Sequence, residues 1–411
     1  MKWLIFAWRN VLRNKRRTTL AAGTIAMGSI TLLAAAGYVN ATFIGLSEST
    51  IKGGVGHFQV GSPGQFDGYQ EMPMDLALDA QDADAVSKKI ATLGEVKFTM
   101  KRVLFEGLIS NGDRTVIFLG QGVEPGKEKK LSRNFAPIIS GRSLPKIRPD
   151  KKVDLNKVII AKDLAKNLGV KPGDFVTILS TTVHGSLNAV DLEVSGLFST
   201  GIPERDQRYL MIPLPIAQSL LGTDKVSRVV AVLKETKAME PILSVMQTAF
   251  PNLEFKSWLE LAPFYQKVVT LYRSIFSVMG AIVVLVVLLS STNTMLLSIM
   301  ERAKEIGTLR AFGISRGRLM INFLLEGGLI GMIGAGIGAV GAYGFAILVN
   351  TSGIMMPPPP GMNVSFPLQF LIEPQFFGIV IILLIIVGAV SAWHPSWLAV
   401  RQKIIDALGH V

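Results

Sequence analysis

The chain has 411 residues, of which 49% are hydrophobic and 18% are charged, and its formal net charge is +12. Globular domains usually carry about 25% charged residues, so this composition indicates long apolar segments and excludes an ordinary soluble enzyme. Much of the positive charge lies beside apolar segments, where it orients membrane helices, which argues against nucleic-acid binding. The chain has no cysteine, which excludes disulfides and thiolate metal sites.

Residues 1–17 carry six basic side chains and no acidic one. Within residues 2–13 the apolar side chains recur at helical spacing, at Leu4, Ile5, Trp8, Val11 and Leu12. This pattern predicts a cytoplasmic amphipathic helix that lies in the membrane interface. The alternative is a charged segment without such a helix.

Residues 18–46 form the first predicted transmembrane helix. Ala34-Ala35-Ala36 is also an acceptable cleavage site for a signal peptide. The apolar part exceeds the ~7–15 residues usual in a signal peptide and continues to Ile44. We therefore expect an uncleaved anchor, with cleavage as the alternative.

Residues 47–264 have a different character, with short alternating segments between Gly, Pro, Asn and Asp. Alternation predicts strands at Val55–Val60, Lys97–Leu104, Thr115–Leu119, Phe175–Leu179, Leu192–Val194 and Val229–Leu233. We predict short helices at Ile159–Leu168 and Leu214–Leu221, ended by Gly169 and Gly222. The segment is expected to be an extracytoplasmic α+β domain, with a division into two lobes around residues 105–140 as an option.

No catalytic group of residues is evident in this domain. The four histidines (His57, His184, His394 and His410) are far apart and lack neighbours at metal-ligand spacing, so we expect surface or turn positions for them. The glycines of residues 334–344 have dinucleotide-like spacings, but they lie inside a predicted membrane span. The sequence therefore predicts no enzyme activity and no bound cofactor for this chain.

The second span is predicted at residues 265–300, with a polar group late in it, at residues 290–294, that suits bonds between helices. Residues 301–314 then form a charged cytoplasmic helix, with an apolar edge of Ala303, Ile306 and Leu309. Gly313 suits its C-cap and Ser315 the cap of the next helix. A simple connector need not be amphipathic, so we predict a docking site for a cytoplasmic partner.

The third span is predicted at residues 315–350. It carries small residues at four-residue intervals, which let helix backbones approach closely in lipid. They are Gly327, Gly331 and Ala335 in one series, and Gly334, Gly338 and Ala342 in the other. They serve packing within the chain or a contact between two chains. Glu326, at the inner boundary, indicates a proton route or an ion pair; we expect a pair with Arg318 or with a partner subunit.

Residues 351–373 contain one charged residue, Glu373, and no basic one, whereas the 301–318 turn is rich in Arg and Lys. The positive-inside rule therefore places residues 47–264 and 351–373 outside the cytoplasm. Residues 374–397 form the fourth span, and residues 398–411 a cytoplasmic tail. Both termini are predicted to be cytoplasmic.

Residues 300–316, followed by residues 323–328, resemble the signature of FtsX-like permeases, the MacB/LolC/LolE group of ABC transporters. They read Met-Glu-Arg-Ala-Lys-Glu-Ile-Gly-Thr-Leu-Arg-Ala-Phe-Gly-Ile-Ser-Arg and Phe-Leu-Leu-Glu-Gly-Gly. Residues 139–144, 158–174 and 192–221 are similar to the MacB-type periplasmic core domain. The resemblance implies a helical membrane protein of the bacterial inner membrane, with four transmembrane helices and a large periplasmic α+β domain between the first and the second.

The resemblance also implies how such a chain works. The 301–314 segment would be the coupling helix that contacts the ATPase, through Glu301, Arg302, Lys304, Glu305, Ile306, Leu309 and Arg310. A separate cytoplasmic ABC ATPase dimer would use ATP and Mg²⁺, and a second permease chain, identical or homologous, would complete the complex. A periplasmic or outer-membrane partner is a further option.

Three functions follow from the resemblance. The four-span architecture favours LolC/LolE-like movement of lipoproteins or other amphiphilic cargo at the outer face of the inner membrane. One alternative is MacB-like efflux of drugs, peptides or siderophores, with an adaptor and an outer-membrane duct. The other is FtsX-like regulation of cell-wall hydrolases.

Overall fold

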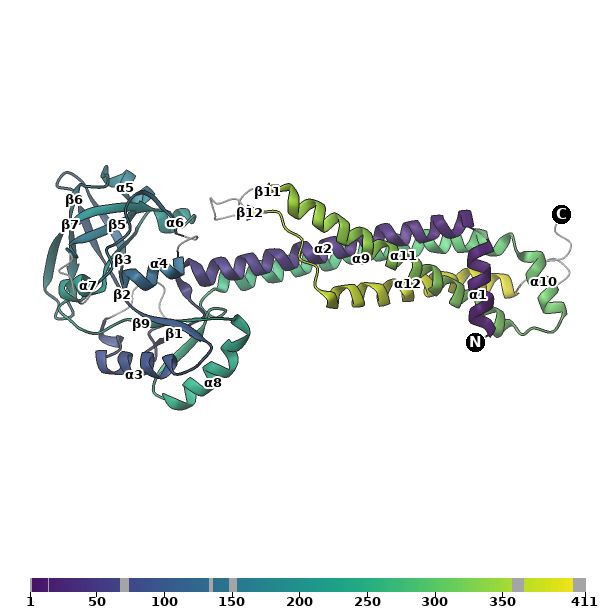
Figure 1. Ribbon diagram of the computed structural model, residues 1–411, viewed down its shortest axis with the longest axis horizontal. Helices are drawn as coiled ribbons and strands as arrows, with labels where there is room; N and C mark the ends of the chain where they lie inside the picture. Colours follow the sequence, from purple (N-terminus) through teal and green to yellow (C-terminus); the bar gives the residue numbers. More distant parts are fainter. Residues whose placement is uncertain are drawn as a thin grey trace. The chain divides into compact units, whose positions relative to one another are not determined.

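The computed structural model describes residues 2–13, 15–66, 74–132, 136–147, 154–356 and 366–401. The chain divides into two compact units (Figure 1). A helical unit contains Met1–Ile44, Val268–Met356 and Phe366–Val411, and an α+β unit contains Gly45–Lys267. Two helices, α2 and α9, each begin in one unit and end in the other.

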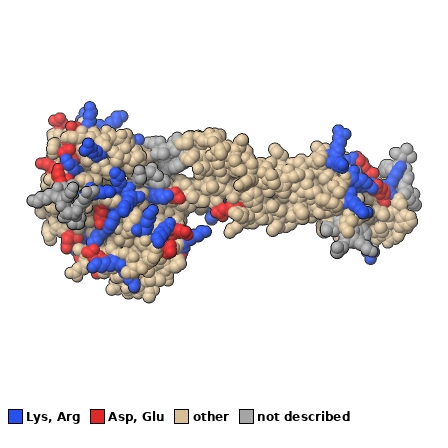
Figure 2. Space-filling view, viewed as in Figure 1, with Lys and Arg blue, Asp and Glu red and all other residues tan. Residues whose placement is uncertain are grey.

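The helical unit consists of α1 (Lys2–Arg13), α2 (Lys15–Thr50), α9 (Pro263–Met300), α10 (Ala303–Ala311), α11 (Arg316–Ser352) and α12 (Pro374–Arg401), with a short ladder of β11 (Met355–Met356) and β12 (Phe366–Pro367). Of the described helices, α2, α9, α11 and α12 are long and apolar enough to cross a bilayer. Figure 2 shows an uncharged surface along these helices, with charged side chains gathered at the end where α1 and α10 lie.

The spanning helices pack through a core of small and aliphatic side chains. Ile25 and Leu33 of α2, Ala335 of α11 and Leu384 of α12 are all fully buried in it. In contrast, most of α9 stays exposed, and the buried positions of its apolar stretch begin at Val287. Lipid does not drive apolar helices together, so this close packing depends on shape.

Helix bounds differ from the predicted ranges by a few residues at several places, two of which concern the short helices α1 and α10. Residues 15–17 belong to α2 rather than to the N-terminal helix, which ends at Arg13. The charged helix predicted at residues 301–314 is α10, Ala303–Ala311; it is shorter than predicted because Arg302 and Phe312 are its two caps.

The α+β unit is built on one continuous sheet, whose strands run in the order β10-β1-β9-β2-β3-β8-β5-β7-β4. The strands are β1 (Phe58–Gly61), β2 (Val96–Ser110), β3 (Thr115–Val123), β4 (Ile138–Gly141), β5 (Lys157–Ala161), β6 (Phe175–Thr181), β7 (Leu187–Phe198), β8 (Tyr209–Pro213), β9 (Arg228–Leu233) and β10 (Glu254–Ser257). The helices are η1 (Ile51–Val55), η2 (Met74–Leu76), α3 (Ala80–Ala91), α4 (Pro125–Ser132), α5 (Lys162–Leu168), α6 (Pro203–Asp206), α7 (Leu214–Leu221), η3 (Thr236–Ala238) and α8 (Met239–Ala249).

Strand β2 belongs to two parts of this sheet. Its first half pairs with β9, in an antiparallel region with β1 and β10 that α3 and α8 accompany (Figure 1). Its last residues pair with β6, and β6 pairs with β7. The strands β2-β3-β8-β5-β7-β6 therefore close into a barrel. A closed barrel leaves no unpaired edge among its strands.

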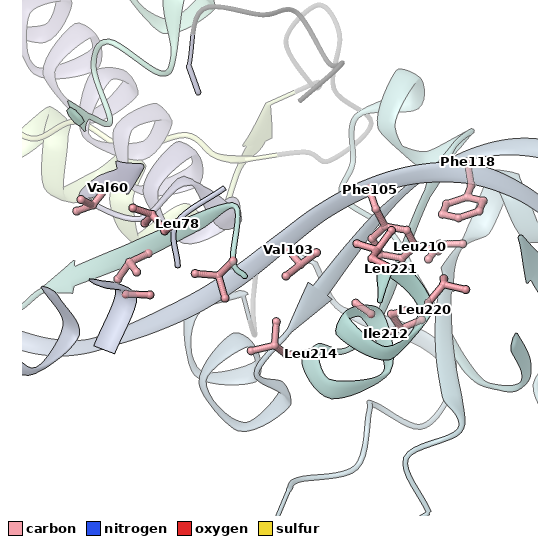
Figure 3. Close-up of a cluster of buried hydrophobic side chains, with 14 of the residues drawn as sticks. Val60, Leu78, Val103, Phe105, Phe118, Leu210, Ile212, Leu214, Leu220 and Leu221 are labelled. Carbon is pink, nitrogen blue, oxygen red and sulfur yellow. The ribbon is translucent and has the colours of Figure 1, made fainter. Parts of the chain in front are cut away.

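The barrel is filled by side chains from alternate strand positions. Figure 3 shows Phe105, Phe118, Leu210 and Leu221 converging in this core. The rings of Phe105 and Phe118 meet edge to face, with centroids 5.5 Å apart. Such a pair contributes about 0.5–1.5 kcal/mol beyond the burial of its area.

The structure corrects the predicted Ile159–Leu168 helix. Residues up to Ala161 form β5, and only Lys162–Leu168 are helical. Strand β5 lies between β7 and β8, with four consecutive buried residues, so it lacks the alternation that reveals a strand in sequence. The predicted helix stops are confirmed, because Gly169 and Gly222 have left-handed backbone conformations.

Two predictions at the start of the α+β unit are also wrong. The strand predicted at Val55–Val60 begins only at Phe58, because α2 and the short η1 occupy the chain up to Val55, with a kink at Gly54. His57, predicted at the surface, is 7% exposed, and its Nδ1 accepts a hydrogen bond from the Leu233 backbone N–H at 3.2 Å. Burial, with Lys52 nearby, lowers the pKa of His57 to about 4.

Candidate functional site

The candidate site is the charged end of the helical unit, where α1, α10 and the start of α11 meet. Its central contact is a buried ion pair between Arg302, the residue before α10, and Glu326 of α11. Arg302 Nη1 lies 3.3 Å from both carboxylate oxygens of Glu326, and the two side chains are only 7% and 4% exposed. Arg302 also donates to the Asn10 carbonyl of α1, at 3.4 Å.

This contact corrects the predicted pairing of Glu326 with Arg318. Arg318 is exposed and lies on the same helix, eight residues earlier. Eight residues correspond to about 12 Å along a helix axis, too far for an ion pair. Arg302 reaches Glu326 from a neighbouring element instead.

Two further ion pairs connect the N-terminal helices to the same segment. Arg13 Nη2 lies 2.6 Å from the carboxylate of Glu305, and Arg17 pairs with Glu301. The Arg13–Glu305 pair is exposed, and such pairs usually contribute less than about 1 kcal/mol to stability. Their effect is to orient α10 relative to α1 and α2.

The inner edge of α10 is apolar, as its sequence predicts. Ile306 is 4% exposed and Leu309 is partly buried. Both pack in a cluster with side chains from α9, α11 and α12: Ile299, Leu319, Phe323, Ala399 and Val400. This packing and the buried ion pair hold the inner side of α10 on the membrane helices.

The outer side of α10 is exposed at Lys304, Thr308 and Ala311. Phe312, its C-cap, is 82% exposed, an unusual position for a large aromatic side chain. Gly313, predicted as the C-cap, is the following residue and has φ = +87°. Ser315 caps α11 by backbone conformation, but its side chain makes no capping hydrogen bond.

The glycines of α11 face two different helices. A Cβ on Gly327 would lie 2.2 Å from the Gly388 carbonyl oxygen of α12, and one on Gly331 would lie 2.7 Å from that of Leu384. On Gly334 it would lie 2.7 Å from the Ala22 carbonyl oxygen of α2, and on Gly338 it would lie 2.3 Å from Ser29 Cβ. All four glycines thus occupy close helix contacts within the chain.

The predicted polar group of α9 contributes one contact between helices. The hydroxyls of Ser291 and Ser391 lie 2.8 Å apart in a buried position, and Ser391 also donates to the Gly388 carbonyl. This contact joins α9 to α12 beside the glycines of α11, which we call the glycine stripe (Gly327, Gly331, Gly334 and Gly338).

The seven predicted coupling residues have different surroundings in the structure. Ile306, Leu309 and Arg302 are directed into the chain, and Glu301 and Glu305 pair with arginines. Lys304 is exposed and Arg310 is partly buried. Sequence reasoning missed Asn10, Arg13, Arg17 and Phe312. Two features of the sequence could have indicated some of them. Arg13 and Arg17 lie four residues apart before the first span, and Phe312 is a lone phenylalanine in a polar turn.

These features define a membrane permease with a large domain between its first two spans, and two family models agree. The model of the FtsX-like permease C-terminal region matches residues 277–404, and that of the MacB-like periplasmic core domain matches residues 18–249. The chain belongs to the MacB/LolC/FtsX family of ABC transporter permeases. Its α+β unit is accordingly the periplasmic domain.

Individual relatives point to several branches of this family. The chain is 25% identical to the lipoprotein-releasing system transmembrane protein LolC of Xylella fastidiosa over 317 residues, 72% of this chain and 74% of the relative. It is 21% identical to LolE of Haemophilus influenzae over 262 residues, 62% of each chain. It is 29% identical to the macrolide export ATP-binding/permease protein MacB of Nitrobacter winogradskyi over 233 residues, 53% of this chain and 32% of that one.

Proposed function

We propose that this permease couples ATP hydrolysis by a separate cytoplasmic ATPase dimer to motion of its periplasmic domain, and that α10 is the coupling helix. The observation that carries the proposal is the two-sided character of α10. Its inner side is fixed by Ile306 and by the Arg302–Glu326 pair, while the side chain of Phe312, at its C-cap, is 82% exposed. An exposed aromatic anchor beside polar groups is the usual composition of a binding hot spot.

The membrane helices supply the path for that motion. Helices α2 and α9 are continuous from the helical unit into the periplasmic domain. A displacement of α10 would act on α9 through the Glu301–Arg302 junction and on α2 through Arg17. ATP and Mg²⁺ would be bound by the ATPase, with this chain as a non-catalytic subunit whose termini are cytoplasmic.

The cargo we propose is a lipoprotein or another amphiphile, handled at the outer face of the inner membrane. The match to LolC over most of both chains supports this choice. A second permease chain, identical or homologous, would complete the complex. Efflux with an adaptor and an outer-membrane duct is the second candidate, which the MacB relative favours.

The test is affinity purification of the tagged chain in mild detergent, followed by mass spectrometry. Recovery of an ABC ATPase with a lipoprotein is the expected result. An ATPase with an adaptor and a duct protein would replace cargo extraction by efflux. Cell-wall cleavage that fails on depletion, without accumulation of cargo, would point to hydrolase regulation. Recovery without any ATPase would overturn the coupling proposal.

A further inference from the structure

A cavity of about 660 Å³ lies in the periplasmic domain between α4, the segment around β4 and the outer face of the barrel. Small-molecule sites typically measure about 300–1,000 Å³, so this cavity is large enough for one small ligand. Its floor is a separate apolar cluster, with Val123, Leu144, Ile159, Phe198 and Met211 exposed by only 0–8%. An apolar group bound there would be removed from contact with water.

The rim of the cavity is basic. Lys129, Arg142 and Lys146 line it and are exposed, and within the described part of the chain none of them forms an ion pair. Glu128 also lines it, but Arg102 neutralises this carboxylate through bonds of 2.7–3.2 Å between two buried side chains. The rim therefore keeps its positive charge.

The sequence segment that contains the three basic rim residues is itself rich in positive charge. Residues 127–152 carry nine Lys or Arg and two acidic residues, Glu128 and Asp150. More than half of the chain's net charge of +12 thus lies in one short segment of the periplasmic domain. Figure 2 shows basic side chains gathered over the region of α4.

Arg142 is held in place by its backbone. Its N–H donates to the Ser195 carbonyl at 2.7 Å, and its own carbonyl accepts from the Ser195 hydroxyl at 3.1 Å. Gly141 makes this approach possible, since a Cβ there would lie 2.5 Å from the Ser195 carbonyl oxygen and its φ is +76°. The backbone that carries the Arg142 side chain is therefore fixed at the rim before any ligand arrives.

We propose that this cavity binds an amphiphile with one acyl chain and an anionic phosphate headgroup, with the chain on the apolar floor and the phosphate beside Lys129, Arg142 and Lys146. Arginine and lysine are the side chains that recognise phosphate, and arginine binds it in a bidentate manner. An acidic peptide would satisfy the rim but not the apolar floor. This inference deepens the proposed function. It rests on that function in one respect, namely that the bound amphiphile is cargo.

The test uses the full chain in phosphatidylcholine nanodiscs and two photoreactive probes with the same diazirine-bearing acyl chain. One probe is a lysophosphatidylglycerol, whose headgroup is anionic, and the other is a lysophosphatidylcholine, whose headgroup is zwitterionic. Mass spectrometry locates the labelled peptides. Labelling of the membrane helices occurs with both probes and serves as the internal reference.

We expect saturable labelling of peptides that contain Phe198 or Met211 with the anionic probe, about tenfold or more above the zwitterionic probe. The rim variant Lys129→Gln/Arg142→Gln/Lys146→Gln should lose this difference. The matched control is Lys166→Gln/Lys171→Gln/Lys237→Gln, which removes three exposed charges elsewhere in the domain and should keep it. Ala136→Trp, at the half-buried wall of the cavity, should block labelling by filling the space, with thermal melting as the check on folding.

Equal labelling by both probes, labelling of membrane helices alone, or full labelling of the rim variant would each overturn the proposal. Competition by an acidic peptide but not by unlabelled lysophosphatidylglycerol would also overturn it, in favour of a peptide site. The outcome is separable from the coupling proposal. If the chain recruits an ATPase but its cavity is not labelled, only the cavity proposal is refuted. If the cavity is labelled but no ATPase is recruited, only the coupling proposal is refuted.

Discussion

Arg302 and Glu326 are 24 residues apart in the chain, and their side chains form an ion pair of 3.3 Å with almost no access to solvent. Arg302 immediately precedes α10, and Glu326 begins the glycine stripe of α11. One contact therefore fixes both the start of the proposed coupling helix and the helix that packs against α2 and α12. This relationship leads to the first prediction.

Arg302→Met should destabilise the chain by about 3–5 kcal/mol, because it leaves the Glu326 carboxylate buried without its partner. The double variant Arg302→Met/Glu326→Leu should recover most of that loss, since apolar pairs often replace buried ion pairs at little cost. Denaturation in detergent measures the free energy of unfolding of both variants. The control is Arg318→Met, which removes an exposed arginine of α11, the helix of Glu326. Its stability should stay within about 0.5 kcal/mol of the parent. An equal loss in the single and double variants would contradict the assignment.

Phe312→Ala should weaken binding of the ATPase by about 2 kcal/mol or more, roughly 30-fold, as expected for an interface hot spot. Its effect on stability should be small, because the side chain is 82% exposed. Titration of the purified permease with its ATPase gives the affinity, and thermal melting gives the stability. Ile117→Ala, an exposed apolar residue of the periplasmic domain at 60% exposure, should leave the affinity unchanged. Unaltered affinity of the Phe312 variant would remove this residue from the interface.

Glu305→Arg should uncouple ATP hydrolysis from transport, because it places a positive charge against Arg13. The exchange Arg13→Glu/Glu305→Arg should restore coupling if the pair acts within this chain. ATPase rate and cargo release, measured in proteoliposomes, report on the coupling. Failure of the exchange to restore coupling would mean that Glu305 contacts the ATPase directly.

Gly338→Ala should destabilise helix packing by about 1–3 kcal/mol, the usual cost of overpacking. Its Cβ would lie 2.3 Å from Ser29 Cβ and 2.5 Å from the Ala26 carbonyl oxygen. Gly336→Ala is the matched control on the same helix, since a Cβ there meets nothing within 4 Å. It should be neutral or stabilise by up to about 1 kcal/mol, because alanine favours the helix. Unfolding in detergent compares the two, and similar values would argue against close packing at Gly338.

The stability of the periplasmic domain should fall as the pH falls from about 6.5 to about 4. His57 has a folded-state pKa of about 4 against a usual value of 6.5, so the unfolded state binds the additional proton in this window. Stability therefore rises with pH across it, by up to about 3 kcal/mol. His57→Asn, whose amide oxygen can accept the Leu233 N–H, should flatten this dependence, whereas His184→Asn at the surface should not. Thermal melting between pH 4.5 and 7.5 gives the comparison.

The membrane architecture was predictable from sequence because a bilayer requires about 20 consecutive apolar residues, a demand that residues 327–350 satisfy without a charge. The apolar edge of α10 was predictable from its periodicity, as Ile306 shows. The partner of Glu326 was not, because Arg302 approaches it from another element, and sequence spacing does not report such contacts. Strand β5 was taken for helix because an apolar run buried on both faces has no alternation. The closure of the barrel depends on β2 pairing with β6, more than 60 residues later.

The order of strands also constrains how the protein is made. β1 follows the first membrane helix, but its two neighbours are β9 and β10, the last strands of the domain. About 190 residues separate the end of β1 from the start of β10, and a ribosome working at about 5–20 residues per second needs roughly 10–40 s to supply them. During that interval the anchored nascent chain presents an unpaired strand outside the membrane, where it can associate with other chains. The pairing of β1 with both of its neighbours is therefore possible only after synthesis has passed Ser257.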